Sequence, residues 1–211
     1  MFEAPIDLLS YISLHPQNWK NASYGALNGV SQQPVLKMLE LYPQLQRVTL
    51  CLDNDKSGRK AASRIHKTLQ QQDYKDVVYD VSAHKDWNED LKASWNYCRI
   101  DAPEDIHGAL KGQYERLETY AEQMGFTVVG SSQDLGSGLN FDRPGLQAVL
   151  EAAKAGSFQV LLVDSVSRIG RDTAKTMNFI QTISGCGINI YSPMEGEIKL
   201  SDFAMPPFQL R

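Results

Sequence analysis

Two aspartates separated by one residue, Asp53 and Asp55, have the types and spacing to hold a divalent metal ion. They follow the apolar run 47–52 and precede a helical pattern over 57–71, so they lie where a buried strand gives way to a helix. Open α/β sheets place their sites at the carboxyl ends of strands. Carboxylate oxygens are ligands that Mg²⁺ prefers, and a bound Mg²⁺ polarises a phosphoryl oxygen. The alternative is that the aspartates only cap the helix or form a turn.

Glu3 is a third carboxylate at a strand-to-helix junction. It precedes a predicted helix over 5–14, whose first turn holds Pro5 and Asp7, as helix starts commonly do. We expect Glu3 to meet the two aspartates at one edge of a sheet and Mg²⁺, or Mn²⁺, to bind there. Because only two residues precede Glu3, we also expect a truncated first strand in a fragment of a longer gene product.

A stripe of basic side chains follows the aspartates on the predicted helix. Its members recur at spacings of four, four and three, which places them on one helical face, with one further arginine beside them. The residues are Lys56, Lys60, Arg64 and Lys67, with Arg59 as the additional arginine. Such a stripe can neutralise the phosphates of a nucleic-acid backbone. The alternative is a solvated helix face without a ligand.

Short strands and amphipathic helices alternate along the whole chain, which predicts an α/β fold class with mainly parallel sheets. In the first half, the expected strands are one that ends at Glu3, 23–27, 47–52 and 77–82, and the expected helices are 5–14, 34–41, 57–71 and 88–93. In the second half, the expected strands are 96–100, 126–130, 159–164 and 187–191, and the expected helices are 109–124, 143–155 and 172–184. We expect two small α/β units, 1–94 and 95–200, followed by a tail over 201–211 that contains Pro206 and Pro207.

Composition narrows the class of protein. The chain has 211 residues with 42% hydrophobic content, enough for folded cores, and no apolar run approaches the roughly 18 residues of a membrane span. No signal peptide is visible, so we expect a cytoplasmic protein without a membrane partner. Cys51, Cys98 and Cys186 are far apart and lack zinc-site spacing, which predicts reduced thiols. The net charge of −4 restricts contact with nucleic acid to a local patch.

The segment 53–62, Asp-Asn-Asp-Lys-Ser-Gly-Arg-Lys-Ala-Ala, together with Glu3 upstream, resembles the Toprim domain of topoisomerases, primases and related nucleases. The segment 85–91, Lys-Asp-Trp-Asn-Glu-Asp-Leu, looks like the closing motif of Toprim-like domains in bacterial mobile elements. The resemblance covers residues 2–93. It implies that Glu3 acts as general acid/base and that Asp53 and Asp55 bind Mg²⁺.

Residues 96–191 resemble the catalytic domain of serine recombinases of the resolvase/invertase family. The matching segments, in chain order, are 97–101, 112–117, 134–138, 142–146 and 163–173. Such enzymes attack a DNA phosphodiester with a serine hydroxyl and hold the phosphate with arginines, whose planar fork suits phosphate oxygens. The resemblance implies an arginine cluster of Arg99, Arg143, Arg168 and Arg171, with Tyr97, Gln113, Asp134 and Ser137 as supporting residues. The alternative for the arginines is ordinary surface salt bridging.

Two positions depart from that family. Asp101 stands where the family carries its nucleophilic serine, and Ser167 stands where it carries an aspartate. A carboxylate at position 101 would repel phosphate and cannot form a phosphoserine intermediate, so we do not expect strand cleavage by the usual mechanism. Ser165 or Ser167 as a substitute nucleophile stays open. No helix-turn-helix is visible after 187–191.

These expectations combine into a nucleic-acid processing protein of a bacterial mobile element. The expected partners are the DNA phosphate backbone and either a second copy of the chain or another protein of the element. If the protein is an enzyme, we expect Mg²⁺-dependent phosphodiester transfer or hydrolysis. Two alternatives stay open, namely a non-catalytic DNA- or partner-binding protein and a site-specific DNA recombinase.

Overall fold

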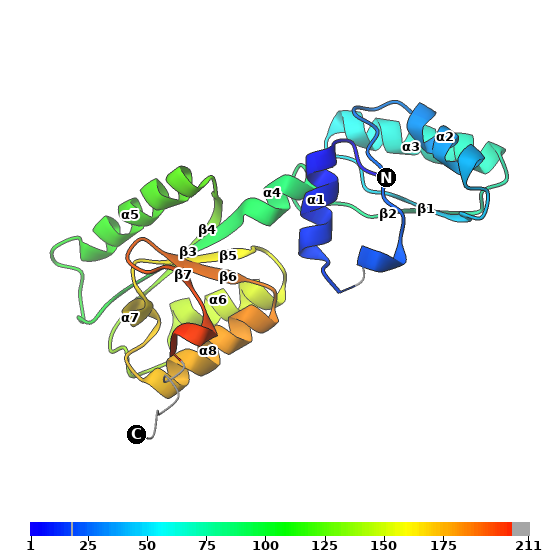
Figure 1. Ribbon diagram of the computed structural model, residues 1–211. Helices are drawn as coiled ribbons and strands as arrows, with labels where there is room; N and C mark the ends of the chain where they lie inside the picture. The colour runs from blue at the N-terminus through cyan, green and yellow to red at the C-terminus, as the bar shows by residue number, and fades with distance from the viewer. Residues whose placement is uncertain (18, 204–211) are drawn as a thin grey trace, which may run out of the picture. The chain divides into compact units, whose positions relative to one another are not determined.

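The computed structural model describes residues 1–17 and 19–203 and divides the chain into two compact units, Met1–Leu91 and Lys92–Arg211 (Figure 1). Each unit combines helices with a mainly parallel sheet, so the fold class is α/β, as the alternation of elements predicts. Among the residues that the structure describes, no helix is long and apolar enough to cross a membrane.

The first unit is built on two regular parallel strands, β1 (Arg47–Leu50) and β2 (Asp76–Tyr79). The segment around Phe2 lies beside β1 and forms isolated parallel bridges with Ala26 and Cys51. The predicted first strand and the predicted strand 23–27 are therefore single bridged positions rather than regular strands. The chain turns away directly after the second of these, because Asn28 and Gly29 both adopt positive φ angles of 53° and 121°.

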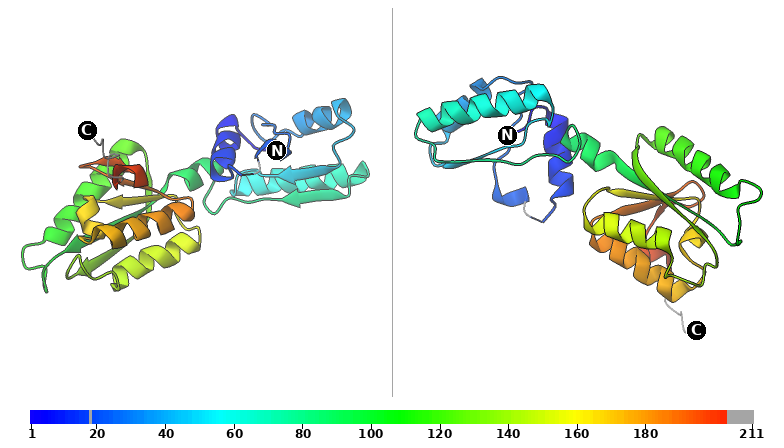
Figure 2. Two further views of the ribbon diagram at one scale, coloured as in Figure 1. Left: turned by 60° about the horizontal axis from the view of Figure 1, so that its bottom comes forward. Right: turned by 180° about the vertical axis from the view of Figure 1, so that it is seen from behind.

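The helices of the first unit cover both faces of this small sheet (Figure 2). On one face, α2 (Gln33–Leu41) and α3 (Lys56–Gln71) bury apolar side chains such as Val35 and Ile65 against the strands. On the other face, α1 (Pro5–Leu14) and Trp87, the first residue of α4 (Trp87–Lys92), pack around Phe2. A 3₁₀ turn, Trp19–Asn21, lies between α1 and α2 in the chain.

The second unit has a five-stranded sheet in the order β4-β3-β5-β6-β7. Its strands are β3 (Ala93–Ile100), β4 (Thr127–Leu135), β5 (Val160–Val163), β6 (Asn189–Ser192) and β7 (Gly196–Ile198). All pairs are parallel except β6 with β7. Every residue of β5 is buried, as expected for a central strand with helices on both faces.

Two helices cover one face of this sheet and one covers the other (Figure 2). α6 (Pro144–Lys154) and α8 (Thr173–Gly185) pack on one side, and α5 (Ala109–Met124) packs on the opposite side. Two short elements complete the unit, α7 (Val166–Ile169) after β5 and a 3₁₀ helix, Leu200–Phe203. The predicted tail 201–211 thus begins as a helical turn, and 204–211, with Pro206 and Pro207, lies outside the described residues.

The element boundaries differ from prediction mainly around β3 and β4. Strand β3 starts at Ala93, so the predicted domain boundary near Ser94 falls inside a strand. Strand β4 continues five residues beyond the predicted end at Gly130, as far as Leu135. Gly130 lies under the ring of Trp95, where a Cβ atom would come within 2.3 Å of the indole. The glycine therefore serves close packing inside a strand rather than a turn.

Candidate functional site

Glu3 and Asp53 lie at the carboxyl ends of neighbouring parallel segments in the first unit. Glu3 follows the bridged residue Phe2, and Asp53 follows Cys51, which is the parallel partner of Phe2. Asp7, in the first turn of α1, is only 4% exposed and adds a carboxyl that the sequence had indicated only as part of a helix start. Parallel pairing thus brings acids that are fifty residues apart in the chain to one edge of the sheet.

The charges of these acids act on one another. The pKa of Asp53 is raised from 3.8 to about 6, first by burial and then by the negative charges of Glu3, Asp7 and Asp86. Burial likewise raises the pKa of Glu3, with Asp55 and Asp7 adding to the effect. Mutual repulsion of this kind marks a place that a cation would stabilise.

Asp55 has a defined structural task. It is the N-cap residue of α3, and its Oδ1 accepts a hydrogen bond of 2.8 Å from the backbone N–H of Gly58. One carboxylate oxygen of Asp55 therefore caps the helix, as the alternative interpretation expects. Its second oxygen makes no hydrogen bond within the described part of the chain, so capping and metal binding are compatible.

The loop that carries the two aspartates is tied to the segment before α4. The backbone N–H of Asn54 donates to the carbonyl of Lys85, and the Asn54 side-chain amide donates to the carbonyl of Ser82 at 3.0 Å. The indole of Trp87 donates to the carbonyl of Cys51 at 3.2 Å. The segment 82–87, which overlaps the motif 85–91 noted in the sequence, thus holds the aspartate loop in place.

The donor set suits Mg²⁺, although the carboxylates are not gathered into a closed site. Among the described residues, no three histidine, cysteine, aspartate or glutamate side chains are arranged to hold a metal ion together. Mg²⁺ keeps several waters and commonly binds through one or two carboxylates and a phosphate, so it does not need three. Glu3 Oε2 and Asp7 Oδ1 are buried oxygens without a hydrogen-bond partner, which leaves acceptors available to a hydrated cation.

The basic stripe faces solvent. Lys56, Arg59, Lys60, Arg64 and Lys67 are all exposed, while the opposite side of α3 packs into the core. Arg59 donates to the carbonyl and side-chain oxygens of Asn54, and Arg64 donates to the carbonyl of Val30. Within the described residues, none of the five takes part in an ion pair. A cavity of about 250 Å³ opens beside Asp53 and Arg59, between the strands and α3.

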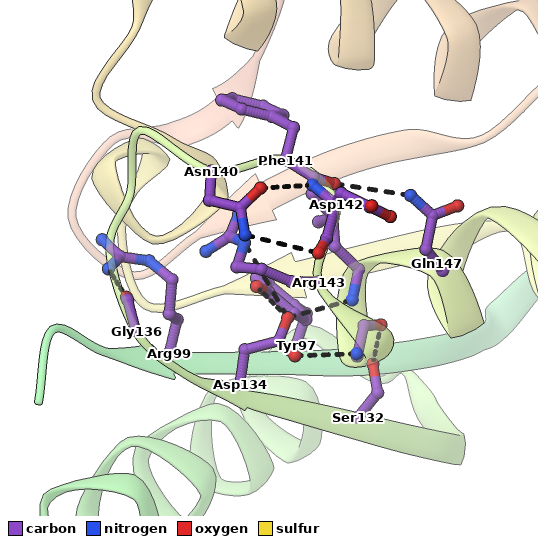
Figure 3. A network of polar contacts seen from close by, with 12 residues as sticks. Tyr97, Arg99, Ser132, Asp134, Gly136, Asn140, Phe141, Asp142, Arg143 and Gln147 are labelled. Atoms are coloured by element: carbon purple, nitrogen blue, oxygen red, sulfur yellow. Dashed lines mark hydrogen bonds and ion pairs between the residues drawn. The ribbon is translucent and has the colours of Figure 1, made fainter. Parts of the chain in front are cut away.

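In the second unit, Asp134 is the centre of a buried polar network (Figure 3). Its Oδ2 accepts the hydroxyl of Tyr97 at 2.7 Å, and its two oxygens accept the backbone N–H groups of Gly145 and Leu146 at 2.8 and 3.0 Å. These amides form the first turn of α6, where a carboxylate is favoured by the helix dipole. Arg143 Nε lies 4.0 Å from the same carboxylate. Asp134 therefore joins β4, β3 and α6.

Arg99 is fully buried, and its guanidinium is used inside the protein. It donates to the backbone carbonyls of Gly136, Ser167 and Arg168 at 2.7, 2.9 and 3.0 Å. Gln113 clamps the Arg99 backbone, because its amide accepts from the Arg99 N–H at 3.1 Å and donates to the Arg99 carbonyl at 3.0 Å. Arg99 therefore holds the loop after β4 and the short helix α7 at one edge of the sheet.

The remaining arginines differ in their burial and in their hydrogen bonds and ion pairs within the protein. Arg143 is 3% exposed and donates to the carbonyl of Ile169, and its Nε and Nη1 atoms make no hydrogen bond to the described residues. Arg168 donates to the carbonyl of Arg99 at 3.3 Å and has its Nε 3.9 Å from Asp164. Arg171 is 56% exposed and forms an ion pair of 2.8 Å with Asp101. The four arginines thus converge on the carboxyl edge of β3 and β5.

The two serines considered as substitute nucleophiles bond to each other. Ser165 Oγ and Ser167 Oγ are 2.7 Å apart, and within the described residues neither hydroxyl is hydrogen-bonded to a histidine, a lysine or a carboxylate. Ser137 Oγ accepts the N–H of Leu139 at 3.2 Å, which shapes the loop after β4. This geometry supplies no base for a serine nucleophile.

Comparison with known proteins agrees with the division of the chain into two units. Residues 94–205 match the family described as the resolvase N-terminal domain, and this stretch makes up more than half of the chain. The chain belongs to the resolvase family. Residues 1–91 match the family described as Toprim-like. We refer to the units below as the Toprim-like and resolvase units.

Individual relatives match only parts of the chain. The uncharacterized protein pXO2-78 of Bacillus anthracis is 31% identical over 101 residues, which cover 45% of this chain and 29% of the relative. The chain therefore spans less than a third of the length of that relative. Among solved structures, the N-terminal catalytic domain of TP901-1 integrase is 27% identical with a TM-score of 0.45, covering 50% of this chain and 79% of the other. The C-terminal catalytic domain of ISC1926 TnpA, an IS607-like serine recombinase, is 27% identical with a TM-score of 0.45, covering 47% and 69%.

Several residues of both units were not identified from the sequence as site residues. In the Toprim-like unit these are Asp7 and Asp86, whose charges act on Asp53. In the resolvase unit Arg116 makes two hydrogen bonds of 2.9 Å to Asp164. The signal for Asp7 was its place in the first turn of a helix next to Glu3. For Arg116 the sequence offers no signal, because its partner lies forty-eight residues away.

Proposed function

We propose that this protein processes nucleic acid for a bacterial mobile element in the cytoplasm, with Mg²⁺ bound at the carboxylate edge of its Toprim-like unit. The observation that carries the proposal is the place of Glu3 and Asp53 at the carboxyl ends of neighbouring parallel segments. Burial first, and then the negative charges of Glu3, Asp7 and Asp86, raise the pKa of Asp53 there to about 6. An edge of this kind is the usual place for a site in an α/β sheet.

The residues divide the work as follows. Asp53 and Asp55 would hold Mg²⁺, or Mn²⁺, which supplies polarisation of a phosphoryl oxygen when bound. The raised pKa of Glu3 suits a carboxyl that takes up and releases a proton, the role of a general acid/base. The exposed lysines of α3 would bind the phosphates on either side of the reacting one. The reaction class is phosphodiester hydrolysis or transfer.

A metal titration tests this assignment. We expect Mg²⁺ and Mn²⁺ to raise the Tm of the wild type and of Asp73→Asn, which makes the same chemical change at an exposed position outside the carboxylate group. The metal-dependent rise should be absent in Asp53→Asn. Nicking of supercoiled plasmid that needs Mg²⁺ and disappears in Asp53→Asn would complete the test. An equal metal response in all three proteins contradicts the proposal.

A second candidate is a non-catalytic DNA-binding role. It is favoured by Asp101, which stands at the nucleophile position of the resolvase unit and is paired with Arg171 at 2.8 Å. In that case the protein binds DNA in EDTA and never nicks it, with or without Mg²⁺. Self-association, or association with another protein of the element, is part of both candidates and is measured by sedimentation velocity.

A further inference from the structure

Asp101 lies between two arginines of the resolvase unit. Its Oδ2 atom is 2.8 Å from Nη1 of Arg171 and 3.9 Å from Nη1 of Arg99. One carboxylate oxygen thus faces both guanidinium groups. Arginines grip the anionic oxygens of carboxylates and phosphates in the same manner, because both anions accept charge-assisted hydrogen bonds from the guanidinium fork.

The two arginines differ in burial and in the number of their hydrogen bonds. Three backbone carbonyls fix the guanidinium of Arg99, which is fully buried. The backbone N–H of Arg171 donates to the carbonyl of Gly138 at 2.9 Å, but its side chain is 56% exposed, and among the described residues its guanidinium contacts no acid other than Asp101. Arg99 is therefore the buried wall of the site, and Arg171 is the exposed one.

Gly138 makes this arrangement possible. A Cβ atom at position 138 would come within 2.9 Å of both Cγ of Arg171 and Nη2 of Arg99. The absent side chain lets the two arginines approach one another across the loop. Asp101 is the anion that faces both of these cations.

We propose that Asp101 is a resident anion, whose carboxylate takes the place of a phosphate oxygen between Arg171 and Arg99 and keeps the resolvase unit from binding phosphate. Asp101 is attached to the strand that carries Arg99, so it competes as an intramolecular ligand with a high effective concentration. Its side chain is 34% exposed, however, so the pair is a partly solvated one of modest strength. A nucleic acid that offers several phosphates displaces the Asp101 carboxylate from Arg171, and its affinity is lowered by this competition. Free phosphate does not displace the carboxylate. This inference does not depend on the proposed metal site.

The test compares Asp101→Asn with Asp142→Asn in the full chain, in EDTA so that the Toprim-like unit binds no metal. Both variants add one unit of net charge in the same unit, and the exposed Asp142 side chain forms no ion pair among the described residues. We expect Asp101→Asn to bind a short DNA duplex about tenfold more tightly than either the wild type or Asp142→Asn. Inorganic phosphate should raise the Tm of Asp101→Asn alone.

Two further variants keep the test decisive. Arg171→Gln combined with Asp101→Asn should abolish the gain in affinity for DNA and for phosphate. Should Asp101→Asn unfold, Asp101→Ala provides the same comparison, because it removes the same charge without adding a nucleophile. The proposal is overturned by equal affinities of the Asp101 and Asp142 variants, or by a folded Asp101 variant that loses stability without gaining phosphate binding, since Asp101 would then have a structural role only.

Discussion

Gly58 lies directly against Asp53: a Cβ atom at position 58 would come within 2.1 Å of the Asp53 carbonyl oxygen. The first turn of α3 can therefore sit over the end of the preceding loop only because residue 58 has no side chain. The same turn holds Asp55, whose carboxylate accepts the N–H of Gly58. Position 58 thus sets the spacing between the two aspartates and the start of the helix.

Replacing Gly58 with alanine should destabilise the Toprim-like unit by about 1–3 kcal/mol, because α3 must move away from the Asp53 backbone. The matched control is Gly112→Ala in α5, where a Cβ atom would meet only Nη1 of Arg116 at an ordinary 3.5 Å. That change should be neutral or stabilising by up to about 1 kcal/mol, because alanine favours the helix. Urea unfolding measures both. Equal stability of the two variants would show that α3 can shift away from the Asp53 carbonyl without a loss of stability.

The raised pKa of Asp53 predicts a distinct pH dependence. The folded protein keeps the Asp53 proton up to about pH 6, whereas the unfolded chain releases it near the ordinary value of 3.8. The folded state therefore binds more protons in this interval, and the free energy of unfolding falls as the pH rises from about 4 to about 6.

Asp53→Asn removes this titration and should be more stable than the wild type above pH 6, with the difference shrinking toward pH 4. The measurement is the difference in Tm between variant and wild type across the pH range without metal. Asp73→Asn, the same chemical change at an exposed position, is the matched control. A flat profile for Asp53→Asn would mean that neither burial nor the neighbouring carboxylates raise the pKa of Asp53.

Elements with a complete amphipathic period could be predicted from the sequence. The predicted helices 5–14 and 109–124 coincide with α1 and α5. The start of α1 is marked by Pro5, and α5 has one buried, mainly apolar face and ends at Gly125. The paired position of Glu3 and Asp53 at one sheet edge also followed from strand ends and parallel topology. The local sequence pattern was sufficient to predict those elements whose conformation is set by their own residues.

The remainder depended on partners distant in the chain. The four-residue α7 and the three-residue β7 are too short to show a period. Strand β4 runs through Gly130 because the ring of Trp95 packs there, a contact that no local pattern shows. The carbonyls that bind Arg99 come from loops thirty-seven and sixty-eight residues away, so sequence identified the arginine but not its partners.

The carboxylate of Asp134 should be the most sensitive polar group of the resolvase unit. Asp134→Ala removes the acceptor of Tyr97 and of two backbone amides and leaves the buried Arg143 without its acid, so we expect a loss of about 3–5 kcal/mol. Tyr97→Phe removes one hydrogen bond and should cost about 1 kcal/mol. A double-mutant cycle by urea unfolding measures their coupling. Strictly additive effects would show that the hydroxyl and the carboxylate do not depend on each other.

The lysines of α3 should set the salt dependence of DNA binding. Lys60 and Lys67 are exposed and form no ion pair among the described residues, so a phosphate can bind each without breaking an internal ion pair. Replacing either with glutamine should lower the slope of log affinity against log salt concentration by about 0.9 for each DNA phosphate that the variant no longer neutralises. Lys75→Gln, an exposed lysine of the same unit that lies outside α3, should leave the slope close to that of the wild type. Fluorescence anisotropy with a short duplex over about 50 to 200 mM salt provides the measurement. Equal slopes for the Lys60, Lys67 and Lys75 variants would show that the face of α3 is a solvated surface and that DNA binds the protein elsewhere.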